Sequence, residues 1–139
     1  MRFLLDTNVL SELVKREPAP RVVDWVAGQS PLDLAISVLT LGEIVKGVGG
    51  LAPGRHRDLL QRWSAREVPR QFAGRVLDID ARVASRWGEL AAAARRDGHA
   101  LPMIDGLLLV TAAVHDLTLV TRNECDCANR GVEIHNPWA

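Results

Sequence analysis

The sequence has few cysteines, almost no lysine and no excess of either charge sign. Basic and acidic side chains number 17 each among the 139 residues, so bulk charge cannot drive binding to a polyanion, which must be met by local chemistry. The only lysines are Lys15 and Lys46, and all other basic residues are arginines. The arginine side chain is well suited to binding phosphate, although a codon bias would give the same excess of arginine over lysine. Cys125 and Cys127 stand one residue apart, which excludes a disulfide framework and is typical of reduced thiols in a cytosolic chain.

Long apolar runs are also missing. No stretch approaches the ~20 apolar residues that a membrane span needs, and the first apolar run meets Asp6 too early for a signal peptide. We therefore expect a cytoplasmic protein that does not contact a membrane. The length favours a single domain with one core over residues 1–139, and no linker, internal repeat or low-complexity segment interrupts it.

Apolar periodicity predicts strands that alternate with helices. Strands are expected at residues 3–5, 32–37, 75–80, 118–121 and 132–135. Helices are expected from Ser11, as the N-cap, to just before Pro18, and at residues 20–29, 38–48, 54–66, 80–97 and 104–116. Since there is little sign of a hairpin, this order predicts an α/β fold, a three-layer α/β/α sandwich around a mainly parallel sheet.

Four acidic residues are candidates for one site at the carboxyl edge of that sheet, where parallel α/β folds bind ligands. Asp6 directly follows the first strand, and Asp126 follows "LVTRNEC" after a later one. Glu43 and Asp105 each border the apolar face of a predicted helix. Taken singly, each acid also fits an ordinary role in a turn, at a helix boundary or N-terminus, or in a solvated loop.

If these four carboxylates cluster, they repel one another unless a cation neutralises them. Carboxylate oxygens are preferred ligands of Mg²⁺ and Mn²⁺, which take the rest of their shell from water and substrate phosphate. Neutral neighbours can orient the acids or bound waters, although they fit turn formation equally well: Thr7, Asn8, Thr121 and Asn123. Arg122 can meet a phosphate, although an arginine at a strand end is usually a surface residue.

Several segments together resemble a known family. "LLDTNVLSELVK", "LTLGEIVKGV", "IDGLLLVTAA" and "LTLVTRN", followed by the terminal "NPW", are similar to successive motifs of PIN-domain ribonucleases of the VapC type, the toxins of bacterial toxin and antitoxin pairs. The "NPW" ending resembles the FitB-like branch. The resemblance implies a PIN-like fold and a hydrolase, an endoribonuclease dependent on Mg²⁺ or Mn²⁺. It also implies that Asp6, Glu43 and Asp105 bind the metal and that Asp126 matches the acid after "TRN".

The resemblance further implies a homodimer, and a complex with a VapB-like antitoxin that binds promoter DNA through the antitoxin. Two surfaces are candidates for that contact: the early helices around Leu13, Val14 and Trp25, and the arginine-rich helix that carries Trp63. One departure is Cys127, which stands where family members commonly have Phe.

Two other readings compete. A haloacid-dehalogenase type of phosphotransfer enzyme would need a second Asp where this chain has Asn8. A non-catalytic PIN-fold binding module in a regulatory DNA or protein complex is the more serious alternative, but a pure scaffold has no need to tolerate four mutually repelling acids.

Overall fold

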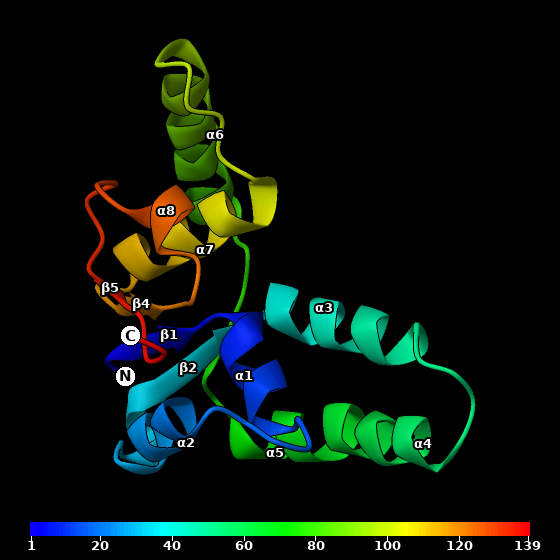
Figure 1. Cartoon of the computed structure of the whole chain (residues 1–139). Helices are drawn as coiled ribbons and strands as arrows, with labels where there is room; N and C mark the ends of the chain where they lie inside the picture. The colour runs from blue at the N-terminus through cyan, green and yellow to red at the C-terminus, as the bar shows by residue number, and fades with distance from the viewer.

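In the computed structural model, which describes residues 1–139, parallel strands form one five-stranded sheet (Figure 1). The strands are β1 (Phe3–Leu5), β2 (Leu34–Ser37), β3 (Val76–Leu77), β4 (Thr118–Val120) and β5 (Ile134–His135). Their order is β3-β2-β1-β4-β5, and every neighbouring pair is parallel. The predicted α/β architecture is thus confirmed. The sheet was expected to be mainly parallel, and all of its neighbouring strands are parallel.

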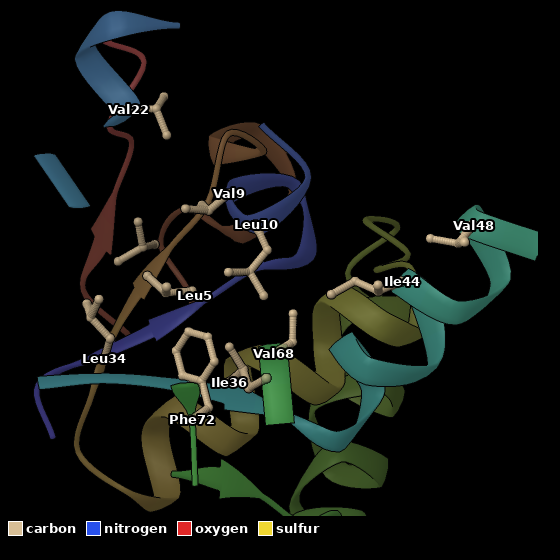
Figure 2. Close-up of a cluster of buried hydrophobic side chains, with 11 residues drawn as sticks. Leu5, Val9, Leu10, Val22, Leu34, Ile36, Ile44, Val48, Val68 and Phe72 are labelled. Carbon is tan, nitrogen blue, oxygen red and sulfur yellow. The ribbon is translucent and has the colours of Figure 1, made fainter. Parts of the chain in front are cut away.

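Helices cover both faces of the sheet, which explains why its strands are apolar at successive positions. Side chains alternate between the two faces of a strand, so Leu4 and Leu5 enter separate core clusters, as do Leu119 and Val120. Figure 2 shows the cluster on the Leu5 face, which also contains Val9, Leu10, Val22, Leu34, Ile36, Ile44, Val48, Val68 and Phe72.

The face that carries Leu5 is covered by α1 (Thr7–Leu13), α2 (Pro20–Ala27) and α5 (Val68–Gln71). The face that carries Leu4 is covered by α7 (Met103–Val114), with α6 (Ala81–Arg96) and the short α8 (Glu124–Cys127) packed beside it. Helices α3 (Val38–Gly49) and α4 (Arg55–Arg62) form an arm that extends from the sheet (Figure 1). No helix of the chain has the length and apolar character to cross a membrane.

The structure corrects several predicted boundaries. The first helix begins at Thr7, because Asp6 and not Ser11 is its N-cap: the Asp6 carboxylate accepts a 2.7 Å hydrogen bond from Thr7 N, and Ser11 lies exposed within α1. The strand expected at 32–37 opens as a 3₁₀ turn, η1 (Pro31–Asp33). The strand expected at 75–80 is only two residues long, because Asp80 already caps α6 through Val83 N.

The helix expected at 54–66 is longer than predicted. It continues from α4 through a π-helical segment, η2 (Trp63–Glu67), into α5. Pro69, which has no N–H to donate, lies at the junction where the π-helical η2 passes into α5.

Candidate functional site

The strand order reverses at β1, and this creates the place where a site is expected. From β1 the chain runs outward through β2 to β3, and then returns to β4 on the opposite side of β1. In open α/β sheets, ligands bind at such a switch point, beyond the carboxyl ends of the strands. Asp6 follows β1 and Thr121 follows β4, and the Asp6 N–H donates to Val120 O at 2.9 Å.

Asp6 is the most buried of the four candidate acids, with 8% of its surface exposed. One carboxylate oxygen caps α1, and Oδ2 accepts a 2.7 Å hydrogen bond from the Thr121 hydroxyl and a 3.4 Å bond from the Asn8 amide. Burial raises the pKa of Asp6 above its usual range, and the charges of Asp105 and Glu43 raise it further, while the hydrogen bonds from Thr121 and Thr7 oppose this shift. No basic side chain pairs with Asp6 to balance its charge.

Glu43 reaches the same place from the outer helix α3. It is half-buried, and its Oε1 accepts a hydrogen bond from the Thr7 hydroxyl. The Thr7 oxygen also lies 3.3 Å from the hydroxyl oxygen of the fully buried Thr40. Helix α3 begins immediately after β2, capped by Ser37, whose hydroxyl accepts from Leu39 N at 3.1 Å. The short cap fixes the direction in which α3 leaves the sheet and thus aims Glu43 at Thr7.

Asp105 and Asp126 share one donor. The side-chain amide nitrogen of Asn123 lies 2.9 Å from Asp105 Oδ2 and 3.0 Å from Asp126 Oδ2. Burial raises the pKa of Asp105, the charges of Asp126 and Glu43 raise it further, and the Asn123 hydrogen bond lowers it. Asp105 stands in the first turn of α7 and Asp126 in α8, so two helices bring these carboxylates together across Asn123.

None of the four acids is paired with a basic side chain. The only salt bridge in the chain joins Lys15 to Glu12, on another part of α1. Each acid accepts hydrogen bonds from neutral groups, and no three His, Cys, Asp or Glu side chains are arranged to hold a metal ion in this conformation. The donor set itself, all oxygen and without a counter-charge, fits a hard divalent cation, which usually takes only one or two carboxylates and keeps its waters.

Comparison with known proteins decides the family. The model of the PIN domain matches residues 3–125. The chain belongs to the PIN-domain family. It is 34% identical to the VapC ribonuclease Y4jK of Sinorhizobium fredii, over 98% of this chain and 97% of that protein. It is 33% identical to Toxin FitB of Neisseria gonorrhoeae, over 98% of both proteins.

Solved structures agree with this family assignment. The crystal structure of FitAcB from Neisseria gonorrhoeae superimposes with a TM-score of 0.92 at 33% identity, covering 98% of both chains. FitAB bound to the IR36 DNA fragment gives a TM-score of 0.93 at 32% identity, covering 99% of this chain and 96% of that one. The resemblance to VapC and FitB proteins is thus confirmed, and so is the fold that it implied.

In this PIN domain the four supporting residues predicted from the sequence, Thr7, Asn8, Thr121 and Asn123, all donate hydrogen bonds within the acidic cluster. Arg122, which was predicted separately to meet a phosphate, is exposed and forms no salt bridge with the acids. Its guanidinium lies over the ring of Trp138, 5.3 Å from the centroid.

Sequence reasoning missed three buried polar residues near this PIN-domain site: Ser37, Thr40 and Glu12. Ser37 had a usable signal, since a serine between an apolar strand and an amphipathic helix is a typical N-cap. For Glu12 the sequence suggests a salt bridge to Lys15 three residues on, but nothing in it indicates burial or the contact with Trp138, 126 positions away.

Proposed function

We propose that this PIN domain is a divalent-metal-dependent endoribonuclease that acts as the toxin of a toxin–antitoxin pair. The observation that carries the proposal is the convergence of four acids, none paired with a basic side chain, at the switch point of the sheet. The names of its relatives, a VapC ribonuclease and the FitB toxin, support the same reaction class.

In this proposal Asp6, Glu43, Asp105 and Asp126 hold Mg²⁺ or Mn²⁺. The chemistry that such an ion supplies when bound is Lewis acidity, which favours an attacking water and stabilises charge on the scissile phosphate. The neutral donors position the acids: Thr121 and Asn8 orient Asp6, Thr7 orients Glu43, and Asn123 sets the spacing of Asp105 and Asp126. Arg122 binds substrate phosphate.

A groove of about 840 Å³ beside Glu43 supports an antitoxin partner. Its apolar lining comes from α3, α4, η2 and the residues that follow α1 and α3, and Lys15, Arg16 and His56 also line it. Val14 and Trp63, which belong to the two surfaces predicted from the sequence, line the same groove. An apolar antitoxin segment can bury side chains there and place a basic group against Glu43, where it competes with metal or phosphate.

The proposed assembly follows from the solved relatives. FitAB has been seen bound to a DNA fragment, and a toxin–antitoxin complex from Klebsiella pneumoniae resembles this chain at 25% identity with a TM-score of 0.73. For this chain we propose a homodimer that joins a VapB-like antitoxin in a hetero-oligomer, with promoter DNA bound through the antitoxin.

The nuclease proposal is tested by incubating purified protein with a panel of structured RNAs in Mg²⁺, Mn²⁺ or EDTA and mapping the ends produced. Discrete new ends that require the metal and disappear in the Asp6→Asn variant support it. Metal-independent cleavage, or cleavage that the variant retains in full, would reject the metal site. No cleavage of any RNA would favour the non-catalytic binding module.

The toxin proposal is tested by expressing the chain with and without the product of the neighbouring gene. Growth arrest without the neighbour, and a stable complex with one antitoxin chain per toxin chain by light scattering, are the expected results. A harmless, strictly monomeric protein that ignores its neighbour would remove the toxin assignment and leave the nuclease chemistry standing.

A further inference from the structure

Arg122 lies beside the acidic cluster in the chain but is held away from it. Its neighbours Thr121 and Asn123 both donate hydrogen bonds to the acids, and none of the four carboxylates is paired with a basic side chain. Opposite charges attract strongly at a partly buried site, so a free arginine would be expected to fold onto these acids. Instead, its guanidinium lies over the Trp138 ring. Trp is the aromatic side chain that attracts a cation best.

Trp138 is itself fixed from two directions. Its indole N–H donates a 3.2 Å hydrogen bond to Glu12 Oε1, and its backbone N–H donates a 2.9 Å bond to Asn136 Oδ1. Its side chain also packs against the core cluster on the Leu5 face of the sheet. The contacts of the C-terminal residues therefore hold the Trp138 ring in a defined position beneath the Arg122 guanidinium.

Glu12 anchors this support. Only 4% of its surface is exposed, and its carboxylate also accepts 3.1 Å hydrogen bonds from Ala19 N and from Lys15 Nζ. A buried acid with three donors is held in one orientation. Glu12 thus connects α1 to the segment before α2 and to Trp138, and the Trp138 ring in turn contacts the Arg122 guanidinium.

We propose that Trp138, fixed by Glu12, is a positioning residue that keeps Arg122 off the acidic cluster and presents it to an RNA phosphate next to the scissile one. The inference deepens the proposed ribonuclease function and rests on it. Arginine stays charged at any working pH and binds phosphate through a planar fork of donors. An Arg122 that paired with the acids would lose this role and would also compete with the metal.

The first test measures binding of a fluorescein-labelled, mixed-sequence single-stranded RNA by anisotropy in EDTA, where no metal-dependent cleavage occurs. Arg122→Ala should lower the dependence of log Kd on log salt by about 0.7, the contribution of one phosphate contact in a single strand. Trp138→Leu should lower the salt dependence to a similar extent, and the Arg122→Ala/Trp138→Leu double variant should show no further loss. Trp138→Phe, which keeps a ring face, should stay close to wild type. Arg70→Ala is the charge-matched control, because Arg70 is exposed on α5, away from this site, and its variant should behave as wild type.

A second measurement separates positioning from a merely structural role. Mn²⁺ binding by calorimetry, without RNA, should weaken several-fold in Trp138→Leu, because the released Arg122 then competes for the acids. Adding Arg122→Ala to that variant should restore the wild-type affinity. Thermal unfolding of each variant accompanies both tests, and Trp138→Met, which keeps more apolar volume, is used if Trp138→Leu does not fold.

The outcomes distinguish the inference from the function on which it rests. Wild-type protein that binds neither RNA nor Mn²⁺ overturns the proposed function and this inference with it. Wild-type binding with an unchanged salt dependence in Arg122→Ala overturns the phosphate role alone. A folded Trp138→Leu or Trp138→Met protein with wild-type salt dependence and Mn²⁺ affinity overturns the positioning role of Trp138.

Discussion

The Thr121 hydroxyl donates a 2.7 Å hydrogen bond to Asp6 Oδ2, which links the ends of β4 and β1 across 115 positions of the chain. The other Asp6 oxygen accepts the Thr7 N–H at the start of α1. Both oxygens of the most buried acid are therefore oriented by neutral donors, and no basic side chain pairs with it. This arrangement stabilises a fixed position for the carboxylate but does not balance its charge, and the predictions below follow from it.

Conservative replacement of the acids should remove most RNA cleavage. We expect Asp6→Asn, Glu43→Gln and Asp105→Asn each to lose about 3 kcal/mol of transition-state stabilisation, or roughly a hundredfold in rate, since each removes a proposed ligand. Asp126→Asn should be milder, because the α8 segment that carries it departs from the family pattern at Cys127. Single-turnover cleavage with saturating Mn²⁺ is the measurement.

The same variants should stay folded. Asn is a good N-cap, so Asp6→Asn keeps the start of α1, whereas Asp6→Ala should lose about 1 kcal/mol. Because each neutral replacement also relieves repulsion, the three variants should match or slightly exceed wild-type stability in EDTA. A marked fall in melting temperature for all three would indicate structural roles for the acids.

The contribution of Asp6 and Asp105 to stability without metal should fall as pH rises. Asp6 and Asp105 have raised pKa values in the folded state, which therefore binds their protons more tightly than the unfolded chain does. Their contribution is fully favourable below the unfolded pKa values and is lost as pH rises from about 4 through the raised values. Glu12 has a lowered pKa, chiefly through the Ala19 N–H, so its contribution has the opposite sign and is lost on acidification.

Comparing Asp6→Asn with wild type isolates the expected slope, because the Glu12 contribution is common to both proteins. Urea unfolding in EDTA at a series of pH values should show a flatter profile for the variant. With saturating Mn²⁺ the wild-type trend should reverse, since a metal competes with protons for the carboxylates. Parallel profiles for the two proteins in EDTA would contradict the raised pKa of Asp6.

The sequence predicted the sheet edge because its signal is local. An apolar run that ends at Asp6, and a second that ends before Thr121, place polar groups at strand ends whatever the details of packing. Glu43 and Asp105 became candidates because each borders an apolar helix face. Local pattern alone thus predicted the alternation of strands and helices, and it selected the four acids whose shared metal site stays a prediction.

What the sequence could not predict depends on distant partners or on local competition. Glu12 accepts a hydrogen bond from Trp138, 126 positions away, and no local pattern pairs them. Ser11 has the sequence pattern of a helix cap, but Asp6 is the N-cap of the same helix about one turn earlier. An acid that directly follows a strand can cap a helix that begins at the next residue. The stacking of Arg122 on Trp138 needed the C-terminal tail to fold back onto α1.

We expect Gly106 not to tolerate replacement by alanine, which adds a single methyl group. A Cβ there would lie 3.0 Å from Cδ1 and 3.1 Å from Nε1 of Trp87, where α6 packs on α7 next to Asp105. We expect Gly106→Ala to destabilise the protein by about 1 to 3 kcal/mol through overpacking, despite the better helix propensity of alanine. Gly88→Ala is the matched control: Gly88 follows Trp87 in α6 with nothing within 4 Å, so urea unfolding should show a gain of up to about 1 kcal/mol. Equal gains in both variants would show that Trp87 moves aside freely.

The two cysteines should differ sharply in reactivity. Cys125 is exposed, whereas Cys127 is buried in the core cluster on the Leu4 face, and burial, helped by the charges of Asp105, Asp6 and Asp126, raises the pKa of its thiol to about 12. The thiolate is the reactive form, so iodoacetamide at about pH 8 should alkylate Cys125 and leave Cys127 intact until the protein unfolds.

Slow labelling of Cys127 then reports the opening of α8, which also carries Asp126. If Asp126 and Asp105 share a metal, Mn²⁺ should slow that labelling by holding α8 against α7, and Asp126→Asn should weaken the effect. Mass spectrometry of timed samples, with Cys125→Ser protein to remove the fast site, measures both rates. Rapid alkylation of Cys127 in the native protein would contradict its burial, and labelling that is indifferent to Mn²⁺ would separate α8 from the proposed metal site.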